Sequence, residues 1–328
     1  MSMPPRHVRL GAVLLLLACA APAGAAQPAG YPARPVRLVV PFAPGGSTDT
    51  LARTIGQKLG ESLGQQVIAD NRPSANGAVG MEIVAHAAPD GYTLLLGYIA
   101  NLAIARSLYA RLPYDPVNDY APITQIASSP NILVVHPSVP AKNLPELIAA
   151  VKARPGHYSF ASAGVASVGH LTGEYLNSIA GIDLQHVPYK GSGQAVIDLV
   201  AGHVPVMFSG FSSALPHVKA GRLRAIATTG AQRSPAAPDV PTVAEQGFPG
   251  FEATAWYGVL APARTPPAIV GRLHDEIVRA LKLPDVQARL GAVGFELVGS
   301  RPDEFAAYMK SETLKWAKVV KASGARAE

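Results

Sequence analysis

Four short loops of glycine, serine and other small residues are the parts of this chain best suited to do chemistry. Each follows an apolar run and precedes a helical pattern: Gly45-Gly46-Ser47, Asn76-Gly77, Gly164 to Ser167, and Gly191-Ser192-Gly193. The first N–H groups of a helix have no partner within the helix, so an uncovered N-terminus attracts anions. The loops therefore favour binding of a carboxylate, although an ordinary strand-to-helix turn uses the same residue types.

Catalysis is a weaker interpretation of these loops. Ser167 and His170 could serve a secreted hydrolase as nucleophile and base, but residues 164–169 hold one residue too many for a Gly-x-Ser-x-Gly elbow. Gly191-Ser192-Gly193 resembles half a dinucleotide fingerprint without its third glycine, and no Gly-Lys-Ser/Thr phosphate loop exists. The nine histidines include no metal-ligand pair on one helix face. We therefore expect no catalytic residue, metal or cofactor.

Several side chains beside the loops allow two interpretations. His170 either contacts a ligand or forms a structural hydrogen bond in the first turn of a helix. Asp49 either caps its own helix or shapes a pocket, and Ser47 or Thr48 could supply the same cap. Tyr189 and Phe42 fit a core as well as a pocket wall.

Alternating strands and helices must position these loops. Apolar runs predict strands at 36–40, 67–69, 92–97, 132–137, 158–162, 186–189, 204–208, 223–228 and 256–262. Apolar stripes predict helices beginning near residues 47, 81, 144, 168, 192, 267 and 300, the third capped by Asn143 with Glu146. Such alternation indicates an α/β fold with a parallel sheet and helices on its faces.

The first 26 residues have the pattern of a secretory signal peptide. Arg6 and Arg9 precede an apolar run at 10–21 that is too short to span a bilayer, and Ala23-Gly24-Ala25 offers a cleavage site. An uncleaved anchor is the alternative, and Cys19, the only cysteine, lies in a poor lipoprotein box. We expect cleavage near Ala26 and export to the periplasm.

Composition argues against a disordered protein and against a nucleic-acid-binding protein. The chain has 328 residues, 48% hydrophobic and 15% charged, which suits two ordinary domains and argues against disorder. The net charge is +6, or +4 without Arg6 and Arg9, and no two lysines or arginines are adjacent. Because nucleic-acid readers cluster their basic residues, we expect no nucleic-acid partner.

Motifs spread in order over the mature chain match one family. They are Pro41-Phe42 with Pro44-Gly45-Gly46 and Asp49; Asp90-Gly91-Tyr92; Ser162-Ala163-Gly164 with Ser167 and His170-Leu171; Pro188-Tyr189-Lys190-Gly191; Pro238 to Thr242 with Glu245 and Gly247; and Trp256 to Pro262 with Thr265-Pro266. Each motif alone is weak. Together they resemble the extracytoplasmic substrate-binding proteins of tripartite tricarboxylate transporters, often called Bug proteins.

The resemblance implies a two-domain periplasmic binding protein fold, each domain a mainly parallel sheet flanked by helices, joined by crossover strands. Domain 1 would comprise residues 31–130 plus 254–328, and domain 2 residues 131–253. A monomer would close on a small carboxylate and deliver it to membrane permease subunits. The implied ligand contacts are Phe42, Gly45, Gly46, Ser47, Asp49, Asn76, Gly77, Ala163, Gly164, Ser167, His170, Tyr189 and Gly191.

Two departures from the family pattern adjoin the expected pocket. Ser74-Ala75-Asn76 stands where the family usually has Pro-Gly-Ala, and Val204-Pro205-Val206 has proline where aspartate is usual. Both leave the identity of the acid open. A ligand-sensing protein that feeds a sensor kinase, and a secreted serine hydrolase using Ser167 and His170, are the alternative functions.

Overall fold

The computed structural model describes residues 1–2, 30–74, 77–165, 167–189 and 191–323. Nearly all of the expected signal peptide therefore lies outside the described residues, as does Asn76. Strands and helices alternate along the described chain, which confirms the α/β class.

The strands agree with the predicted positions, except that one is much longer and the last, of two residues, was not predicted. They are β1 (Val36–Val40), β2 (Val67–Asn71), β3 (Thr93–Tyr98), β4 (Tyr120–Val135), β5 (Ser159–Ser162), β6 (Gln185–Pro188), β7 (Val206–Gly210), β8 (Arg224–Thr228), β9 (Thr254–Pro262) and β10 (Glu296–Leu297).

The helices cover both faces of the sheet. They are α1 (Ser47–Leu63), α2 (Ala78–Ala85), a π-helical turn (Ala100–Ile104) leading into α3 (Ala105–Leu108), α4 (Leu144–Ala153), α5 (Val168–Ala180), α6 (Ser192–Val200), α7 (Phe211–Lys219), a 3₁₀ turn (Ala244–Gln246), α8 (Pro267–Leu281), α9 (Pro284–Gly291) and α10 (Pro302–Ser323).

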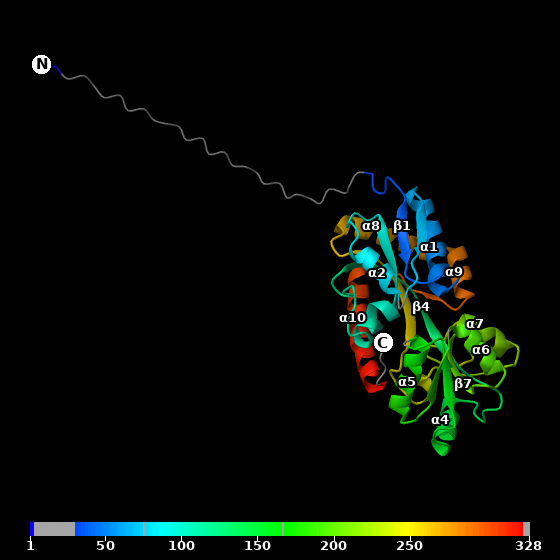
Figure 1. Cartoon of the computed structure of the whole chain (residues 1–328). Helices are drawn as coiled ribbons and strands as arrows, with labels where there is room; N and C mark the ends of the chain where they lie inside the picture. Colours follow the sequence, from blue (N-terminus) through cyan, green and yellow to red (C-terminus); the bar gives the residue numbers. More distant parts are fainter. Residues whose placement is uncertain (3–29, 75–76, 166, 190, 324–328) are drawn as a thin grey trace.

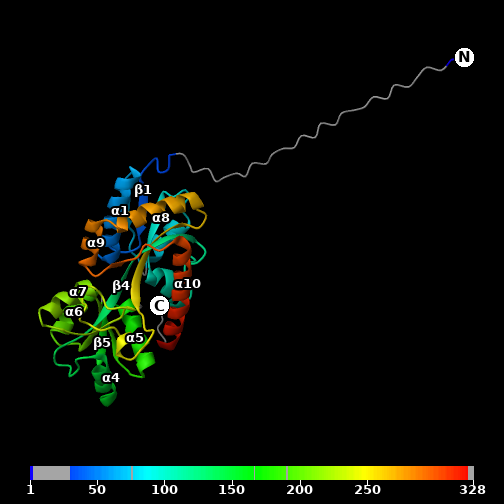
Figure 2. The same cartoon turned by 180° about the vertical axis from the view of Figure 1, so that it is seen from behind.

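One long strand, β4, pairs with strands in both halves of the sheet. The strand order is β2-β1-β3-β9-β4-β7-β5-β6, and β8 and β10 also pair with β4. From Tyr120 to Pro130 β4 pairs with β9, and from Asn131 to Val135 it pairs with β7. Figures 1 and 2 show the other elements in two groups, one around β1 with α1, α8 and α9, and one around β7 with α4 to α7. We call these the first and second lobes.

Pairs of strands within each lobe are parallel, as expected, and the crossing strands β4 and β9 make the sheet as a whole mixed. In the first lobe β1 pairs in parallel with β2 and β3, and in the second lobe β5 pairs in parallel with β6 and β7. Every antiparallel pair among the described strands involves β4 or β9. The reason is topological, because the chain crosses between the lobes along β4 and returns along β9 in the opposite direction.

Prolines explain why the first part of β4 and the whole of α7 were not predicted. Pro122 and Pro130 lie within β4, where proline normally argues against a central strand. The pairing of β4 with β9 shifts register beside Pro122, which accommodates the missing N–H. Helix α7 was missed for a similar reason, since Pro216 lies inside it.

Of two predicted helix N-caps, one is confirmed and one is wrong. Asn143 caps α4 as expected: its side chain accepts a hydrogen bond from the backbone N–H of Glu146 at 2.9 Å. The expected side-chain cap of α1 is wrong. Gly46 occupies that N-cap position, and Ser47 is the first helical residue.

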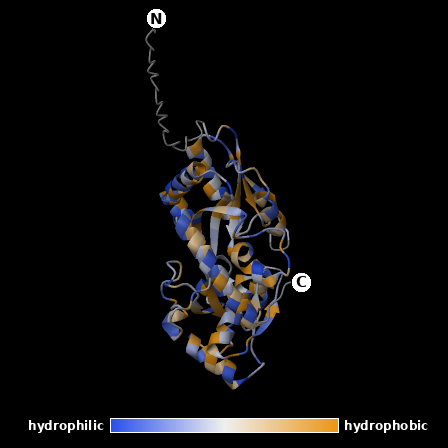
Figure 3. Ribbon diagram, turned by 90° about the vertical axis from the view of Figure 1, so that its left-hand side faces the viewer, coloured by the Kyte–Doolittle hydropathy of each residue, from blue (hydrophilic) through white to orange (hydrophobic). Residues whose placement is uncertain are grey.

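A continuous hydrophobic core reaches from one lobe into the other. It joins side chains of β1 and β3 to side chains of β5, β7 and α5, with Trp256 and Trp316 among its largest fully buried members. Around the outer helices hydrophobic and hydrophilic residues alternate (Figure 3), as expected for one buried face. Helix α10 lies along this core and packs against β4 and α5. The lobes are therefore packed together on the α10 side.

A buried carboxylate holds the two tryptophans. Glu312 on α10 is 3% exposed, and one of its oxygens accepts hydrogen bonds from Trp256 Nε1 and Trp316 Nε1, both at 3.0 Å. Lys315 forms an ion pair with the same carboxylate. The interaction fixes α10 to β9, the strand by which the chain returns to the first lobe.

Replacing Glu312 by alanine should therefore destabilise the protein. Two indole N–H groups would remain buried without an acceptor, at a cost of about 1–3 kcal/mol each. We expect urea denaturation followed by circular dichroism to give a free energy of unfolding lower by about 2–5 kcal/mol. Lys318→Ala, an exposed change on the same helix, is the control and should have little effect. Equal stability of Glu312→Ala and wild type would contradict this role.

Candidate ligand-binding site

A cavity lies where the two lobes meet beside β4. Its volume is about 130 Å³. Residues of both lobes line it: Ser47, Tyr98, Ser129, Asn131, Ala163, Ser167, Val168, Gly169, Ser192, Phe208, Gly210, Phe211, Ser212, Ala255, Tyr257, Val293 and Phe295. None of these described residues is charged, and their polar groups are hydroxyls, backbone amides and one side-chain amide.

Four helices begin at this cavity. From the first lobe, α1 begins at Ser47; from the second lobe, α5, α6 and α7 begin at Val168, Ser192 and Phe211. Each N-terminus carries unpaired N–H groups and about half a positive charge. The sequence predicted three of these helices, whereas α7 and its N-cap Gly210 were not predicted. The arrangement suits an anion bound without a cationic side chain.

The loops of the second lobe are held to one another. Ser167 is the N-cap of α5, and its Oγ accepts from the backbone N–H of His170 at 3.2 Å. The N–H of Gly191 donates to the carbonyl of Ala163 at 3.1 Å. Gly164 has a φ of +137°, which favours glycine. Ala163 and Ser167 thus line the cavity, and a backbone hydrogen bond joins their loop to the loop of Gly191.

The loop of the first lobe is organised by Asp49. Its Oδ2 accepts from the N–H of Gly45 at 2.9 Å and from Arg53 Nε at 3.0 Å. Burial raises the pKa of this carboxyl, but hydrogen bonds from Arg53, Gly45 and Asn71 outweigh burial and hold the pKa below its ordinary value. Asp49 therefore remains ionised and shapes the turn, while Ser47 faces the cavity.

Only one of the two turn glycines is required by backbone conformation. Gly45 has a φ of +86°, whereas Gly46 has a φ of −85°. A Cβ atom added to Gly46 would have only the Ala43 carbonyl oxygen nearby, at 3.9 Å. A larger residue at Gly46, which directly precedes the lining residue Ser47, would therefore strain nothing in the turn.

Of the expected contact residues that the structure describes, Ser47, Ala163 and Ser167 line the cavity, and nine do not: Phe42, Gly45, Gly46, Asp49, Gly77, Gly164, His170, Tyr189 and Gly191. Three of these nine pack against other residues. Gly77 packs against Pro41, where an added Cβ would lie 2.5 Å from the proline Cβ. The hydroxyl of Tyr189 donates to Asp198 Oδ2 at 2.8 Å, and its ring packs against the second hydrophobic cluster. The ring of Phe42 packs edge-on against Tyr98, with centroids 5.6 Å apart.

Aromatic rings form one wall of the cavity. Tyr98 stacks on Tyr257 with centroids 5.0 Å apart, and Tyr257 meets Phe295 edge-on at 5.4 Å. Burial raises the pKa of Tyr257 to about 12, partly offset by a hydrogen bond from Ser47. Burial also raises the pKa of Tyr98. Both tyrosine hydroxyls therefore stay protonated at neutral pH, and the wall is uncharged.

Sequence reasoning missed Asn131 as a cavity residue. It directly follows Pro130 and begins the part of β4 that pairs with β7. It is 6% exposed, and its Nδ2 atom has no hydrogen-bond partner among the residues that the structure describes. The only signal in the sequence was a polar residue opening an otherwise apolar strand.

The ring of His170 belongs to a histidine pair behind the second-lobe loops. It stacks on His186 with centroids 3.9 Å apart, and its Nε2 lies 3.8 Å from Glu174. His186 Nε2 lies 2.7 Å from Ser162 Oγ, and that hydroxyl also bonds Gly164. His170 is therefore not among the described lining residues, and the pair supports the loop that ends at Ser167.

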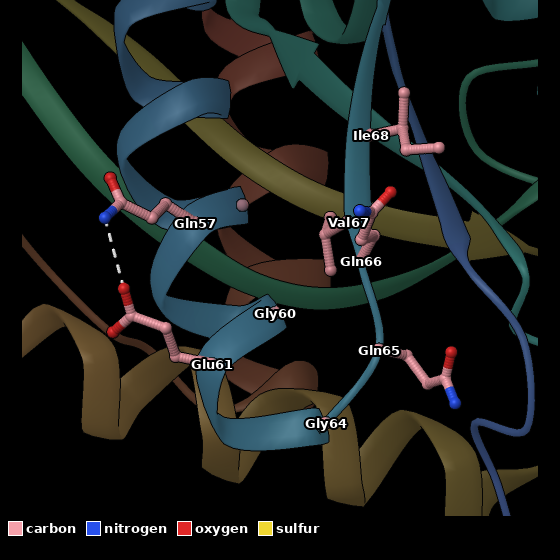
Figure 4. Close-up of a pocket in the computed structure, with 9 residues that line it drawn as sticks. Gln57, Gly60, Glu61, Gly64, Gln65, Gln66, Val67 and Ile68 are labelled. Atoms are coloured by element: carbon pink, nitrogen blue, oxygen red, sulfur yellow. Dashed lines mark hydrogen bonds between the residues drawn. The ribbon is translucent and has the colours of Figure 1, made fainter.

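A second hollow lies along α1, away from the helix N-termini. It encloses about 560 Å³ and is more open. Figure 4 shows Gly60 on α1, Gly64 just after that helix, Val67 on β2, and Gln57 hydrogen-bonded to Glu61. A Cβ at Gly60 would lie 3.2 Å from the Gln65 carbonyl, so close packing of α1 on its own turn explains this glycine. None of the buried unpaired polar atoms found in the described chain lies in this hollow.

The described part of the chain contains no cluster of three potential metal ligands among His, Cys, Asp and Glu. No helix within it has the length and hydrophobicity needed to cross a membrane.

Two lobes that share crossing strands, with an uncharged cavity between them, define a solute-binding protein of the periplasmic type. A family model described as "Tripartite tricarboxylate transporter family receptor" matches residues 51–325. The chain belongs to this family, which confirms the resemblance found in its motifs. Family members are periplasmic solute receptors and not enzymes. The serine hydrolase interpretation of Ser167 and His170 is therefore excluded.

Individual relatives support the same family assignment. Protein BugT of Bordetella pertussis is 40% identical over 310 residues, which cover 93% of this chain and 95% of that protein. The solved structure "R. palustris Rpa4515 with adipate" has a TM-score of 0.80 and 35% identity, covering 90% of this chain and 99% of its own. MatC from Rhodopseudomonas palustris with bound malate has a TM-score of 0.75 and 36% identity, covering 88% of this chain and 100% of its own.

The histidine pair predicts a pH dependence of stability. Burial lowers the pKa of His170 to about 4, and burial together with the His170 ring lowers that of His186 to about 4. In the unfolded chain histidine titrates near its ordinary pKa of about 6.5. Between about pH 6.5 and pH 4 the unfolded chain binds protons that the folded chain does not. The free energy of unfolding should therefore decrease as the pH is lowered through this range.

Urea denaturation at pH 7 and pH 5 measures this fall. His186→Phe keeps a stacked ring and should show a smaller fall, whereas His203→Gln, at an exposed position, should match wild type. Glu174, whose pKa is raised by burial, acts in the opposite direction and is present in all three proteins. An equal fall in His186→Phe would refute the assignment.

Proposed function

We propose that this protein captures a small organic acid between its lobes in the periplasm and delivers it, as a monomer, to the membrane permease of a tripartite transporter. The observation that carries the proposal is the convergence of four helix N-termini on one uncharged cavity. Solved relatives with adipate and with malate support the choice of a carboxylate.

Uncharged donors are sufficient to hold a carboxylate in this cavity. Charge-assisted hydrogen bonds contribute about 1.5–3 kcal/mol each, and helix N-termini add a favourable potential. The proposed donors are the backbone N–H groups near Gly46–Ser47 and Gly164–Ser167 with the Ser167 hydroxyl. The other expected contacts, among them Phe42, Gly191 and Tyr189, would act by supporting these loops.

We propose that the two lobes are two domains. Residues 31–130 plus 254–328 would form domain 1, and residues 131–253 domain 2. The change in the partner of β4 between Pro130 and Asn131 supports this boundary. Export would follow cleavage of the first 26 residues, near Ala26, with lipid attachment at Cys19 as the alternative.

A thermal-shift screen of small organic acids tests the proposed function, and substitutions at the helix N-termini test how the acid is held. Ser167→Ala removes one hydroxyl and should weaken binding by about 1–2 kcal/mol, or roughly 5- to 30-fold. Gly46→Val should weaken binding more, because its side chain would occupy space that the ligand needs while leaving the turn unstrained. Calorimetry with the best acid of the screen measures both.

Asn143→Ala is the matched control for Ser167→Ala. It removes the N-cap of α4, which does not begin at the cavity, so it should lower stability by about 1 kcal/mol and leave the affinity unchanged. The binding mode is wrong if Ser167→Ala and Gly46→Val bind like wild type while an arginine substitution elsewhere abolishes binding.

Ligand should also bring the lobes closer together. We propose hinges near residues 129–131 and 254–257, where β4 and β9 cross between the lobes. Small-angle X-ray scattering should give a smaller radius of gyration with saturating acid than without it. A non-binding acid of the same panel, at equal concentration, is the control. An unchanged radius with saturating ligand would argue for a rigid or already closed cleft.

A further inference from the structure

Asn131 combines three properties that are rarely found together. It lines the cavity, it is 6% exposed, and its Nδ2 atom has no hydrogen-bond partner among the described residues. Buried side-chain amides normally satisfy their donors, because an unpaired buried donor is unfavourable. The missing partner calls for a specific explanation at this position.

Backbone hydrogen bonds fix the place of Asn131 in the strand. Its N–H donates to Thr229 Oγ1 at 2.8 Å, and its carbonyl accepts from the Thr229 N–H at 3.0 Å. Side chains alternate between the faces of a strand, so Asn131 shares a face with Leu133 and Val135, both fully buried in the main core. Asn131 is thus the last side chain of a buried row, at the point where that row reaches the cavity.

We propose that Asn131 Nδ2 donates a hydrogen bond to an oxygen of the bound acid, and that Asn131 is a specificity-determining residue of the site. This inference rests on the proposed function. The amide completes its hydrogen bonding only when the cavity holds a ligand with a suitably placed carboxylate or hydroxyl oxygen. Since Asn131 also begins the second-lobe part of β4, the contact links occupancy of the cavity to the junction between the lobes.

The experiment separates ligand recognition from structural support by measuring two quantities. Asn131→Leu replaces the amide by an apolar group of similar size, so the melting temperature of the ligand-free protein should stay equal or rise. Its affinity should fall at least ten-fold. The probe is whichever of adipate, malate and benzoate most raises the melting temperature of the wild type, with affinities from calorimetry.

Thr228→Val is the matched control. Thr228 is fully buried on the neighbouring strand β8, its hydroxyl also lacks a partner among the described residues, and it does not line the cavity. Its melting temperature should likewise stay equal or rise, while its affinity stays unchanged. Asn131→Ala, which adds no bulk, should lose affinity to a similar extent and guards against misfolding of the leucine variant.

Three results would overturn the inference. Unchanged affinity in Asn131→Leu and Asn131→Ala shows that the amide does not contact the ligand, while the proposed function stands. A melting temperature several degrees lower in both variants shows a structural role. A wild type that binds none of the three acids, nor any acid of the wider screen, overturns the proposed function and this inference with it.

Discussion

The structure depends on one strand that belongs to two lobes. Over its 16 residues β4 exchanges hydrogen bonds first with β9 and then with β7 and β8, so both parts of the sheet share one backbone. Because strand pairing fixes register, this continuity also fixes which loops face each other across the junction. The N-terminus of α1 thereby meets those of α5, α6 and α7 at the same cavity.

The lobes pack together on one side, and the cavity lies between them on the other. Along α10 the core is continuous, because α10 packs against α5 of the second lobe while Glu312 fixes α10 to β9 through Trp256 and Trp316. On the opposite side lie the cavity and the exposed turn at Gly46. Packing of this kind is compatible with the proposed bending at the crossing strands.

The cavity attracts an anion without using a cation. Fixed backbone dipoles carry little conformational entropy and cost little desolvation, whereas a buried arginine would need compensation whenever the site is empty. The nearby charges are already neutralised, since Asp49 is paired with Arg53 outside the lining. An aromatic wall of Tyr98, Tyr257 and Phe295 then leaves shape and a few polar atoms to select among acids.

The sequence by itself determined the α/β class, the family, and three of the four helix N-termini, because apolar periodicity and small-residue loops are local signals. It could not reveal α7 or the first half of β4, since Pro216, Pro122 and Pro130 contradict the local rules for helices and strands. Only the tertiary structure decided that Gly77 and Tyr189 stand apart from the cavity while Asn131 lines it. That choice depends on pairings between strands distant in sequence, which no local pattern encodes.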